Sequence, residues 1–306
     1  MKKNLFLLGF VLIATTMMAQ TEKSESWYFK VGGSYFMQTA ATEFPTVGGK
    51  DALRKVYQGG KLVSEESVTG SFGEGFRTGI TAGYRFNARL GFEMGINYYS
   101  SKDKTMAQTI SDVPFIPTGS VYNFKSVGQI TAFDLAPSLV LFLGEHKGFE
   151  PYTKVGVLVP VHGDLEITTD AVAPVGVNPS TGAPVFGAVH SVDVVKPNPT
   201  LGFSAVVGTS YKLGKNISAF AELEYRNFTV HGKTKETTEF TVNGADALST
   251  RTKSQIHTNY VDKLTTTSNN IATNPNGVDT TKPLNELSSY VGISGLGLTL
   301  GLKYSL

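Results

Sequence analysis

In the extended segments of this sequence, charged side chains are concentrated at alternate positions, which would share one face of a strand; this set of positions is called a parity. Six basic and four acidic residues share that parity. Successive side chains of a strand point to opposite faces, so all ten would line the inside of a closed sheet. Two roles are open: a polar gate or narrow path for protons or ions, or a packed network in which opposite charges pair and fill the interior. The ten residues are Lys30, Arg77, Arg85, Glu93, Asp134, Lys154, Glu222, Glu224, Arg226 and Lys303.

We favour the packed network, because an unpaired charge in a narrow, poorly hydrated interior is strongly destabilising. A tight turn at 87–89 would place Arg85 one diagonal step from Glu93 on the inward face. Glu222 would neighbour a final strand on which Lys303 points inward. That strand would in turn close against the strand that carries Lys30. We therefore expect close ion pairs among these residues.

Catalytic and metal-binding patterns are weak by comparison. No two histidines have the i, i+4 spacing of a helical zinc site. His162 with Asp164 or Asp170 is one candidate dyad, and an ordinary histidine at a strand end is the favoured alternative. The chain has no cysteine, which excludes disulfides, a lipoprotein acylation site and thiolate metal ligands. We predict no catalytic residue, cofactor or metal; the histidines are His146, His162, His190, His231 and His257.

The elements that would position the charged face are strands with regular alternation. The clearest is 295–306, GLGLTLGLKYSL, which has leucines on one parity and small or polar residues on the other. A soluble sandwich could alternate in this way, whereas a membrane barrel would turn the apolar face to lipid. Pro137 interrupts one strand, where we expect a bulge or a local break. Seven further segments alternate: 27–38, 75–86, 90–99, 129–143, 151–162, 200–213 and 217–228.

The connections between these segments alternate in length, and this favours the membrane. Short connections at 87–89, 144–149 and 214–216 alternate with long ones at 39–74, 101–128, 163–199 and 229–289. Outer-membrane barrels have short periplasmic turns and long extracellular loops. In the third long connection, 178–183 resembles a hairpin tip whose flanking strands would extend beyond the membrane. We therefore predict an all-β fold, a transmembrane antiparallel up-and-down β-barrel of about eight strands with both termini in the periplasm.

The N-terminus and the composition agree with export to that membrane. Residues 1–19 combine two lysines, a short apolar run and small residues, which predicts a cleaved signal peptide rather than an N-terminal anchor. Residues 20–306 would then form a single barrel domain. Outward-facing aromatic residues near the strand ends predict belts at both membrane interfaces. The formal net charge of +2 gives no electrostatic support for nucleic-acid binding.

The C-terminal octet TLGLKYSL resembles the assembly signal of bacterial outer-membrane barrels, with a terminal leucine where phenylalanine is usual. The segment FEPYTKVGV, which begins at Phe149, is similar to a strand start common in such proteins. With the hairpin pattern, the chain resembles the small OmpA/OmpX-type outer-membrane β-barrel superfamily, without a peptidoglycan-binding domain. The resemblance implies recognition by the outer-membrane assembly machinery through Thr299, Gly301, Tyr304 and Leu306.

Members of this superfamily differ in activity, so the resemblance leaves several functions open. We expect a non-enzymatic barrel in the bacterial outer membrane with a structural or surface-interaction role carried by its long loops. The first alternative is a narrow channel for small solutes or hydrophobic molecules. The second is an enzyme that modifies lipid A or cleaves surface peptides. The expected partners are outer-membrane lipid, lipopolysaccharide and an extracellular ligand bound through the loops.

The alternation of connection lengths generates a topological prediction. Epitope tags near Gly182 and Asn276, in two of the long connections, should be labelled by antibody on intact cells. A tag at Asn216, in a short connection, should be labelled only after the cells are permeabilised. Labelling of Asn216 on intact cells would reverse the proposed orientation.

Overall fold

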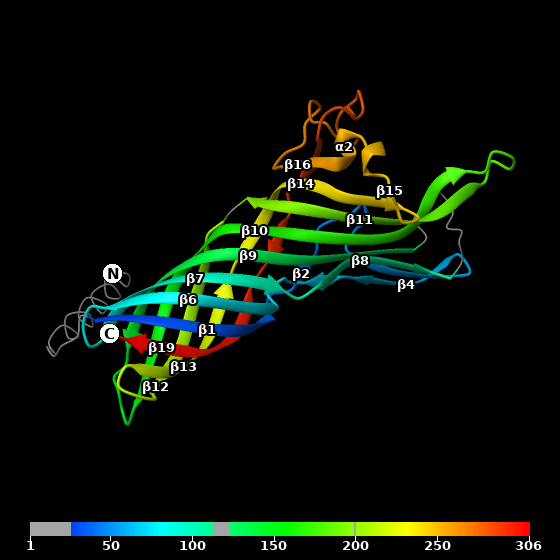
Figure 1. Cartoon of the computed structure of the whole chain (residues 1–306). Helices are drawn as coiled ribbons and strands as arrows, with labels where there is room; N and C mark the ends of the chain where they lie inside the picture. The colour runs from blue at the N-terminus through cyan, green and yellow to red at the C-terminus, as the bar shows by residue number, and fades with distance from the viewer. Residues whose placement is uncertain (1–25, 113–122, 199) are drawn as a thin grey trace, which may run out of the picture.

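The computed structural model describes residues 26–112, 123–198 and 200–306, and the predicted signal peptide lies outside them. Eight antiparallel strands form a closed ring, because the last strand pairs with both the first strand and its own predecessor (Figure 1). The predicted eight-stranded barrel is therefore confirmed. In ring order the strands are β1 (Ser26–Gln38), β6 (Gly75–Arg85), β7 (Leu90–Ser101), β9 (Asn123–Phe142), β10 (Phe149–Val177), β12 (Gly202–Lys212), β13 (Ile217–Asn227) and β19 (Gly295–Ser305).

The short turns lie at the end of the barrel where β1 begins and β19 ends, and the long connections lie at the other end (Figure 1). In the β6–β7 turn, the side-chain Oδ1 of Asn87 accepts hydrogen bonds from the backbone N–H groups of Arg89 at 2.8 Å and Leu90 at 2.9 Å. Such a side chain replaces a backbone acceptor and fixes a tight turn.

In the part of the chain that the structure describes, the long connections extend the sheet beyond the ring, and only 262–283 form a long run without a strand. β10 has 29 residues and pairs with β11 (Pro184–Asn198) in a hairpin closed at 178–183, as predicted. Inside this tip, the N–H of Asn178 donates to the carbonyl of Ala183 at 2.8 Å. The other elements of this extension are β2 (Thr42–Glu43), β3 (Leu53–Gln58), β4 (Lys61–Ser67), β5 (Thr69–Gly70), β8 (Lys104–Ser111), β14 (Thr229–Val242), β15 (Ala245–Asp246), η1 (Leu248–Thr250), α2 (Lys253–Ile256), β16 (His257–Val261), β17 (Leu284–Leu287) and β18 (Tyr290–Gly292).

The outer face of the ring is apolar and carries two groups of aromatic rings. Near the loop end, the ring centroids of Tyr35 and Phe76 lie 4.9 Å apart. Near the turn end, those of Trp27 and Tyr84 lie 5.1 Å apart. Rings with one apolar and one wet end favour the membrane interface. These positions match the predicted belts and set the lipid-facing band between them. Within the described residues, no helix is long and apolar enough to cross a membrane.

The interior has two layers of different chemistry. The layer nearer the turns is charged, and the layer nearer the loops is apolar. Phe44 and Phe72, from the connection between β1 and β6, pack into the apolar layer with their ring centroids 5.3 Å apart. Phe72 is fully buried there, as are Tyr99 of β7 and Met106 of β8. Residues of the first long connection therefore pack into the mouth of the barrel together with apolar side chains of the strands.

The two prolines in the wall differ in their effects. Between β9 and β10 the ladder omits Pro137 but keeps its register on both sides, which is a local break without a bulge. Between β7 and β9 the pair Met94–Pro137 stays in register. The shift of register occurs instead between Pro160 and His162 of β10. Pro137 is tolerated because only one of its two edges loses a ladder bond.

The outward parity of β19 generates a second prediction. Leu300 is 58% exposed on the lipid face, next to the inward-facing Thr299. Replacing Leu300 with Arg should reduce the free energy of unfolding by about 2–4 kcal/mol if the site lies near the bilayer midplane. Urea titration of the protein in vesicles measures this change. The conservative variant Thr299→Ser serves as the control and should unfold like the wild type; equal stability of both variants would refute the parity assignment.

Candidate functional site in the barrel lumen

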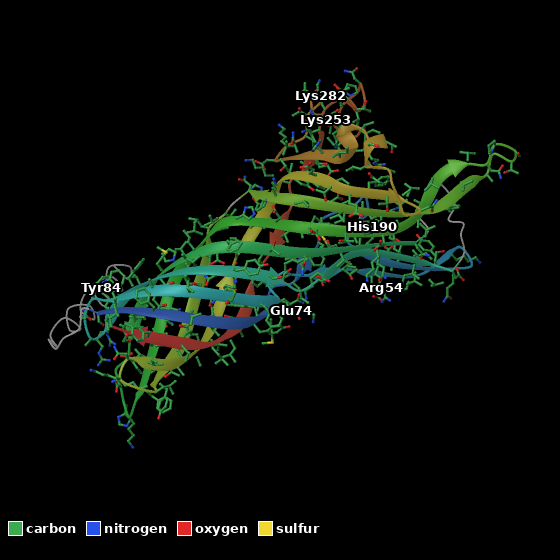
Figure 2. The ribbon with its side chains drawn as sticks, viewed as in Figure 1. Arg54, Glu74, Tyr84, His190, Lys253 and Lys282 are labelled. Atoms are coloured by element: carbon green, nitrogen blue, oxygen red, sulfur yellow. The ribbon has the colours of Figure 1, made fainter. Side chains whose placement is uncertain are left out.

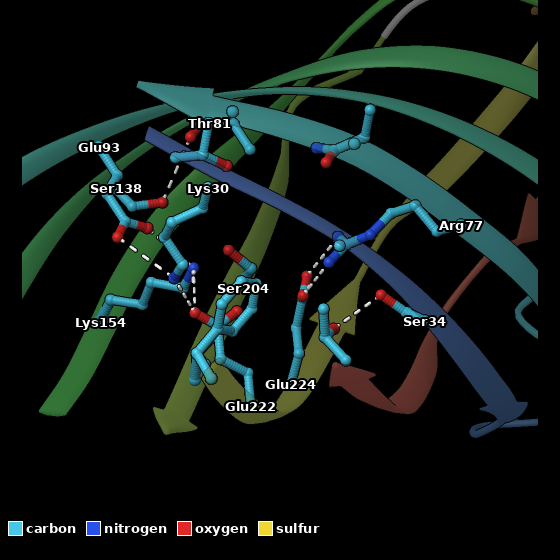
Figure 3. Close-up of a pocket in the computed structure, with 18 residues that line it drawn as sticks. Lys30, Ser34, Arg77, Thr81, Glu93, Ser138, Lys154, Ser204, Glu222 and Glu224 are labelled. Carbon is cyan, nitrogen blue, oxygen red and sulfur yellow. Dashed lines mark hydrogen bonds and ion pairs between the residues drawn. The ribbon is translucent and has the colours of Figure 1, made fainter. Parts of the chain in front are cut away.

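Four charged side chains from four strands meet at the centre of the lumen in alternating sign (Figure 3). Lys30 of β1 contacts Glu93 of β7, with Nζ and Oε1 3.3 Å apart, and also contacts Glu222 of β13. Lys154 of β10 contacts the same two carboxylates at 2.9 Å and 3.0 Å. Each charge therefore has two neighbours of opposite sign, which compensates for its removal from water.

Two tyrosines complete this central cluster. The Tyr28 hydroxyl donates to Glu93 at 3.0 Å, and the Tyr152 hydroxyl donates to Glu222 at 2.7 Å. The Lys30 ammonium also lies 4.3 Å from the centre of the Phe220 ring. The alternation along the strands predicts that both tyrosine side chains point inward. It does not predict their partners, because a neutral hydroxyl carries no charge that would indicate one. They supply the extra hydrogen bonds that a buried carboxylate requires.

Within the charged layer, a second group of charged residues lies toward the mouth. Both terminal nitrogens of the Arg77 guanidinium donate to the Glu224 carboxylate, and Nη1 lies 2.7 Å from Oε1. Asp134 accepts a hydrogen bond from the Asn97 amide at 2.7 Å and lies 3.7 Å from Arg226. The Arg226 guanidinium is 2% exposed and is centred 4.8 Å from the Tyr99 ring. Arg226 therefore joins the charged layer to the apolar mouth.

A third group of charged residues lies toward the turns, and its contacts show that two of the predicted pairs are wrong. Arg85 pairs with Glu150 at 2.7 Å, and Lys303 lies 3.4 Å from the other oxygen of Glu150. The expected contacts of Arg85 with Glu93 and of Lys303 with Glu222 are absent from the described ion pairs. Glu93 is opposite Gly83 in the β6–β7 ladder, so its side chain lies deeper in the lumen than Arg85.

Glu150 is the acidic residue that the sequence prediction missed. The alternating segment is predicted to begin at 151, whereas β10 begins at Phe149. Glu150 alternates with Tyr152 and Lys154, which both face inward, and this spacing could have predicted that Glu150 faces inward too. With Glu150 included, all ten predicted residues have a carboxylate or basic partner, and together they make six basic and five acidic groups among the described residues of the lumen.

The space left within the network is small. A cavity of about 50 Å³ remains among Lys30, Arg77, Glu93 and their neighbours. This volume suffices for a few water molecules and is far below that of a ligand pocket. Among the described residues, the charge network therefore fills this part of the lumen and leaves less room than a ligand pocket has.

The candidate histidine dyad is loose. His162 Nε2 and Asp164 Oδ2 are 3.8 Å apart, beyond hydrogen-bond range. Asp170, the other candidate, is paired with His190 at 2.8 Å on the extension (Figure 2). Among the described residues, no group of three histidine, aspartate or glutamate side chains could hold a metal ion.

A separate charge cluster fixes the rim at the loop end. Glu74, labelled in Figure 2, binds Lys104 and Lys102 and accepts a hydrogen bond from the Tyr35 hydroxyl at 2.9 Å. The hydrogen bond from Lys104, with that from Tyr35, lowers the pKa of Glu74 to about 2. The carboxylate therefore stays charged at any physiological pH and holds the start of β6 to β8.

The predicted assembly signal lies along β19. Thr299 points inward and shares a hydrogen bond with Ser34 at 2.7 Å. A Cβ atom at Gly301 would lie 2.6 Å from the Phe220 ring and would collide with the Val31 carbonyl, so only glycine fits there. Tyr304 and Leu306 are exposed on the apolar side. Recognition of these residues by assembly machinery stays a prediction.

A closed eight-stranded ring with a lipid-compatible exterior and a paired-charge interior defines a bacterial outer-membrane β-barrel. The chain belongs to the outer membrane protein beta-barrel domain family, whose model matches residues 7–246. The crystal structure of OprG from Pseudomonas aeruginosa is similar, with a TM-score of 0.43 and 10% identity over 93% of this chain and 97% of that one. Neisserial surface protein A gives a TM-score of 0.33 and 11% identity over 91% and 96%. No curated protein matches the chain.

The central cluster generates a third prediction. Glu93→Gln and Glu222→Gln each leave buried lysines short of a negative partner, which should lower the free energy of unfolding by about 3–5 kcal/mol. Urea titration in vesicles measures the loss, and planar-bilayer recording should show raised conductance where the barrel still folds.

Glu145→Gln is the matched control, since Glu145 pairs with Lys212 in an exposed position at 3.0 Å. A surface pair of this kind contributes little to stability. Large, steady conductance of the wild type, unchanged in both lumen variants, would contradict a closed lumen.

Proposed function

We propose that this chain is a closed, non-enzymatic outer-membrane barrel whose extracellular β-extension binds partners at the cell surface. Two separate barriers lie along the lumen: the charge network in one layer and the apolar packing around Phe72 in the next. Both support a role other than conduction. A solute crossing the lumen would have to displace both. A catalytic role has less support, because the His162–Asp164 separation of 3.8 Å is too long for a general-base relay.

The observation that carries the proposal is the tip of the β10–β11 hairpin, residues 171–189. This run contains no charged residue. β10 has no described ladder partner on the β9 side beyond Val172, and β11 pairs with β14 only from Val189 onward. Among the described residues the tip is therefore a two-stranded ribbon, and it lies at the end of the molecule opposite the short turns (Figure 1).

Apolar side chains are exposed along this ribbon. Val177 is 64% exposed and Val185 is 45% exposed. Exposed apolar patches on soluble surfaces mark contact sites for other molecules, since water contact with them is unfavourable. Pro174 and Pro184 lack backbone N–H groups, so they discourage strand addition along the edges. These features favour a partner that packs against the faces of the ribbon through apolar contacts.

The test is site-specific photo-crosslinking on intact cells. A crosslinker at Val177 should give discrete adducts with a surface or extracellular protein, and the variant Val177→Lys/Val185→Lys should reduce adducts formed from a crosslinker at Val175. The folding of this variant, read from the migration of unheated and boiled protein, should be unchanged. Asn276→Lys in another exposed loop is the matched control and should leave the adducts intact. Absence of discrete adducts from 175 and 177 would contradict the proposal.

A further inference from the structure

The three short turns carry an excess of positive charge at their end of the barrel. Residues 86–89, 143–148 and 212–216 contain four basic residues and one acidic residue. The acidic residue, Glu145, pairs with Lys212 at 3.0 Å, so these two charges compensate each other. Arg89, Lys147 and Lys215 have no ion pair among the described residues. Three positive charges are therefore left without a partner at the turn end.

The loop end has the opposite balance of charge. The described parts of the long connections, 39–74, 102–112, 163–198 and 229–289, contain 17 acidic and 13 basic residues. In the lumen, the group nearest the turns adds to the positive excess, because Arg85 and Lys303 share the single carboxylate of Glu150. The positive excess is therefore a property of the turn end and not of the whole surface. A surface of one sign attracts partners of the opposite sign.

Hydrogen bonds hold the three turns against the neighbouring strands around the barrel end. The carbonyl of Arg89 accepts from the N–H of Phe142 in β9 at 2.7 Å, and that of Gly148 accepts from the last residue of β12 at 3.0 Å. The side-chain amide of Asn216 donates to the carbonyl of Ser305 in β19 at 2.7 Å. The unpaired cations are therefore distributed around the ring, each on a fixed turn.

Lys147 has a backbone conformation that a lysine adopts rarely. Its φ is 50° and that of Gly148 is 85°, in a two-residue turn closed by His146 and Phe149. Such a turn favours asparagine followed by glycine, since both residues need a positive φ. An unfavoured conformation of this kind supports a functional role for the side chain. Lysine supplies a positive charge at the tip of the turn, which asparagine would not.

The cations lie beside the aromatic belt of the turn end. Lys212 follows Tyr211, whose ring centroid is 4.6 Å from that of Phe149. Lys215 lies between Leu213 and Ile217, which are 59% and 47% exposed. Long basic side chains at such an interface pack their stems on apolar surface and extend their charged ends into the head-group layer. Anionic lipid heads attract basic residues held at this level.

We propose that the turn end binds the head groups of anionic phospholipids in the adjacent leaflet, which is the periplasmic leaflet in the predicted topology. Arg89, Lys147 and Lys215 bind the head-group phosphates, while the acyl chains pack against the aromatic belt. A zwitterionic phospholipid has no net charge and is bound less well. Because the attraction is between charges at the surface, salt weakens it. This binding is separate from the hairpin tip at the loop end.

Trp27 is a native probe of the lipid at this place. It is the one tryptophan of the chain, and it is 51% exposed on the lipid face near the turn end. Brominated acyl chains quench tryptophan, so vesicles with equal amounts of phosphatidylglycerol and phosphatidylcholine, one of them brominated, report which lipid lies beside Trp27. We expect phosphatidylglycerol to be enriched about threefold at low salt. In about 1 M salt, where the screening length is about 3 Å, the enrichment should disappear.

Charge variants test which residues cause the enrichment. Arg89→Gln/Lys147→Gln/Lys215→Gln should abolish it, and unheated protein should still migrate as a folded barrel. The matched control, Lys61→Gln/Lys253→Gln/Lys263→Gln, removes the same charge from exposed positions of the extension and should keep the enrichment. Lys147→Asn/Lys215→Gln suits the turn better and should lower the enrichment if the triple variant folds poorly.

Moving the probe tests the location. Trp27→Phe/Phe76→Trp places the tryptophan in the aromatic group near the loop end, where Phe76 is 68% exposed, and should show no preference for phosphatidylglycerol. Equal quenching of Trp27 by the two brominated lipids would overturn the proposal. So would enrichment that persists in both turn variants, or enrichment at position 76 as large as at Trp27.

Discussion

Compensation of charge inside a narrow lumen is the constraint on which this barrel depends. The pairs do not join neighbouring strands: Lys30 of β1 reaches Glu93 of β7, and Arg77 of β6 reaches Glu224 of β13. Each pair therefore couples the registers of strands that are not adjacent in the ring. A slip of one residue in any of them would turn a charge toward lipid and leave its partner unpaired in the lumen. The network therefore specifies the strand registers of the closed barrel and also fills its lumen.

The sequence predicted the strands and the charged face because both depend on local patterns. Alternation identifies which residues of β19 face inward, and loop length predicts which end faces the cell surface. Pairing across the lumen has no such local signature. It depends on strand tilt and stagger, which place Glu93 deeper than Arg85 although the two are close along the hairpin. Glu150 was missed for a related reason, since a strand end is set by the neighbours that pair with it.

The two interior layers resist opening by different physical means. Ion pairs such as Lys154–Glu93 oppose the separation of charges in a medium of low dielectric constant. The mouth around Phe72 and Met106 opposes the entry of water into an apolar core. The two layers are in contact through Arg226, which lies over the Tyr99 ring, and through Phe36, which contacts both Arg77 and Tyr99. Outside the lipid-facing band, the extension also carries exposed apolar side chains, among them Val177 and Val185.

Proline shows how local chemistry and ring context together decide where the wall is weak. Pro137 and Pro160 each remove one ladder donor, yet the wall is held together around Pro137. Its neighbour β7 stays in register and keeps the strand in place. Pro160 instead coincides with the shift of register against β9, and β10 has no described ladder partner on its other side between Leu158 and Leu165. A proline therefore weakens this wall only where the neighbouring strands do not hold the register on both sides of it.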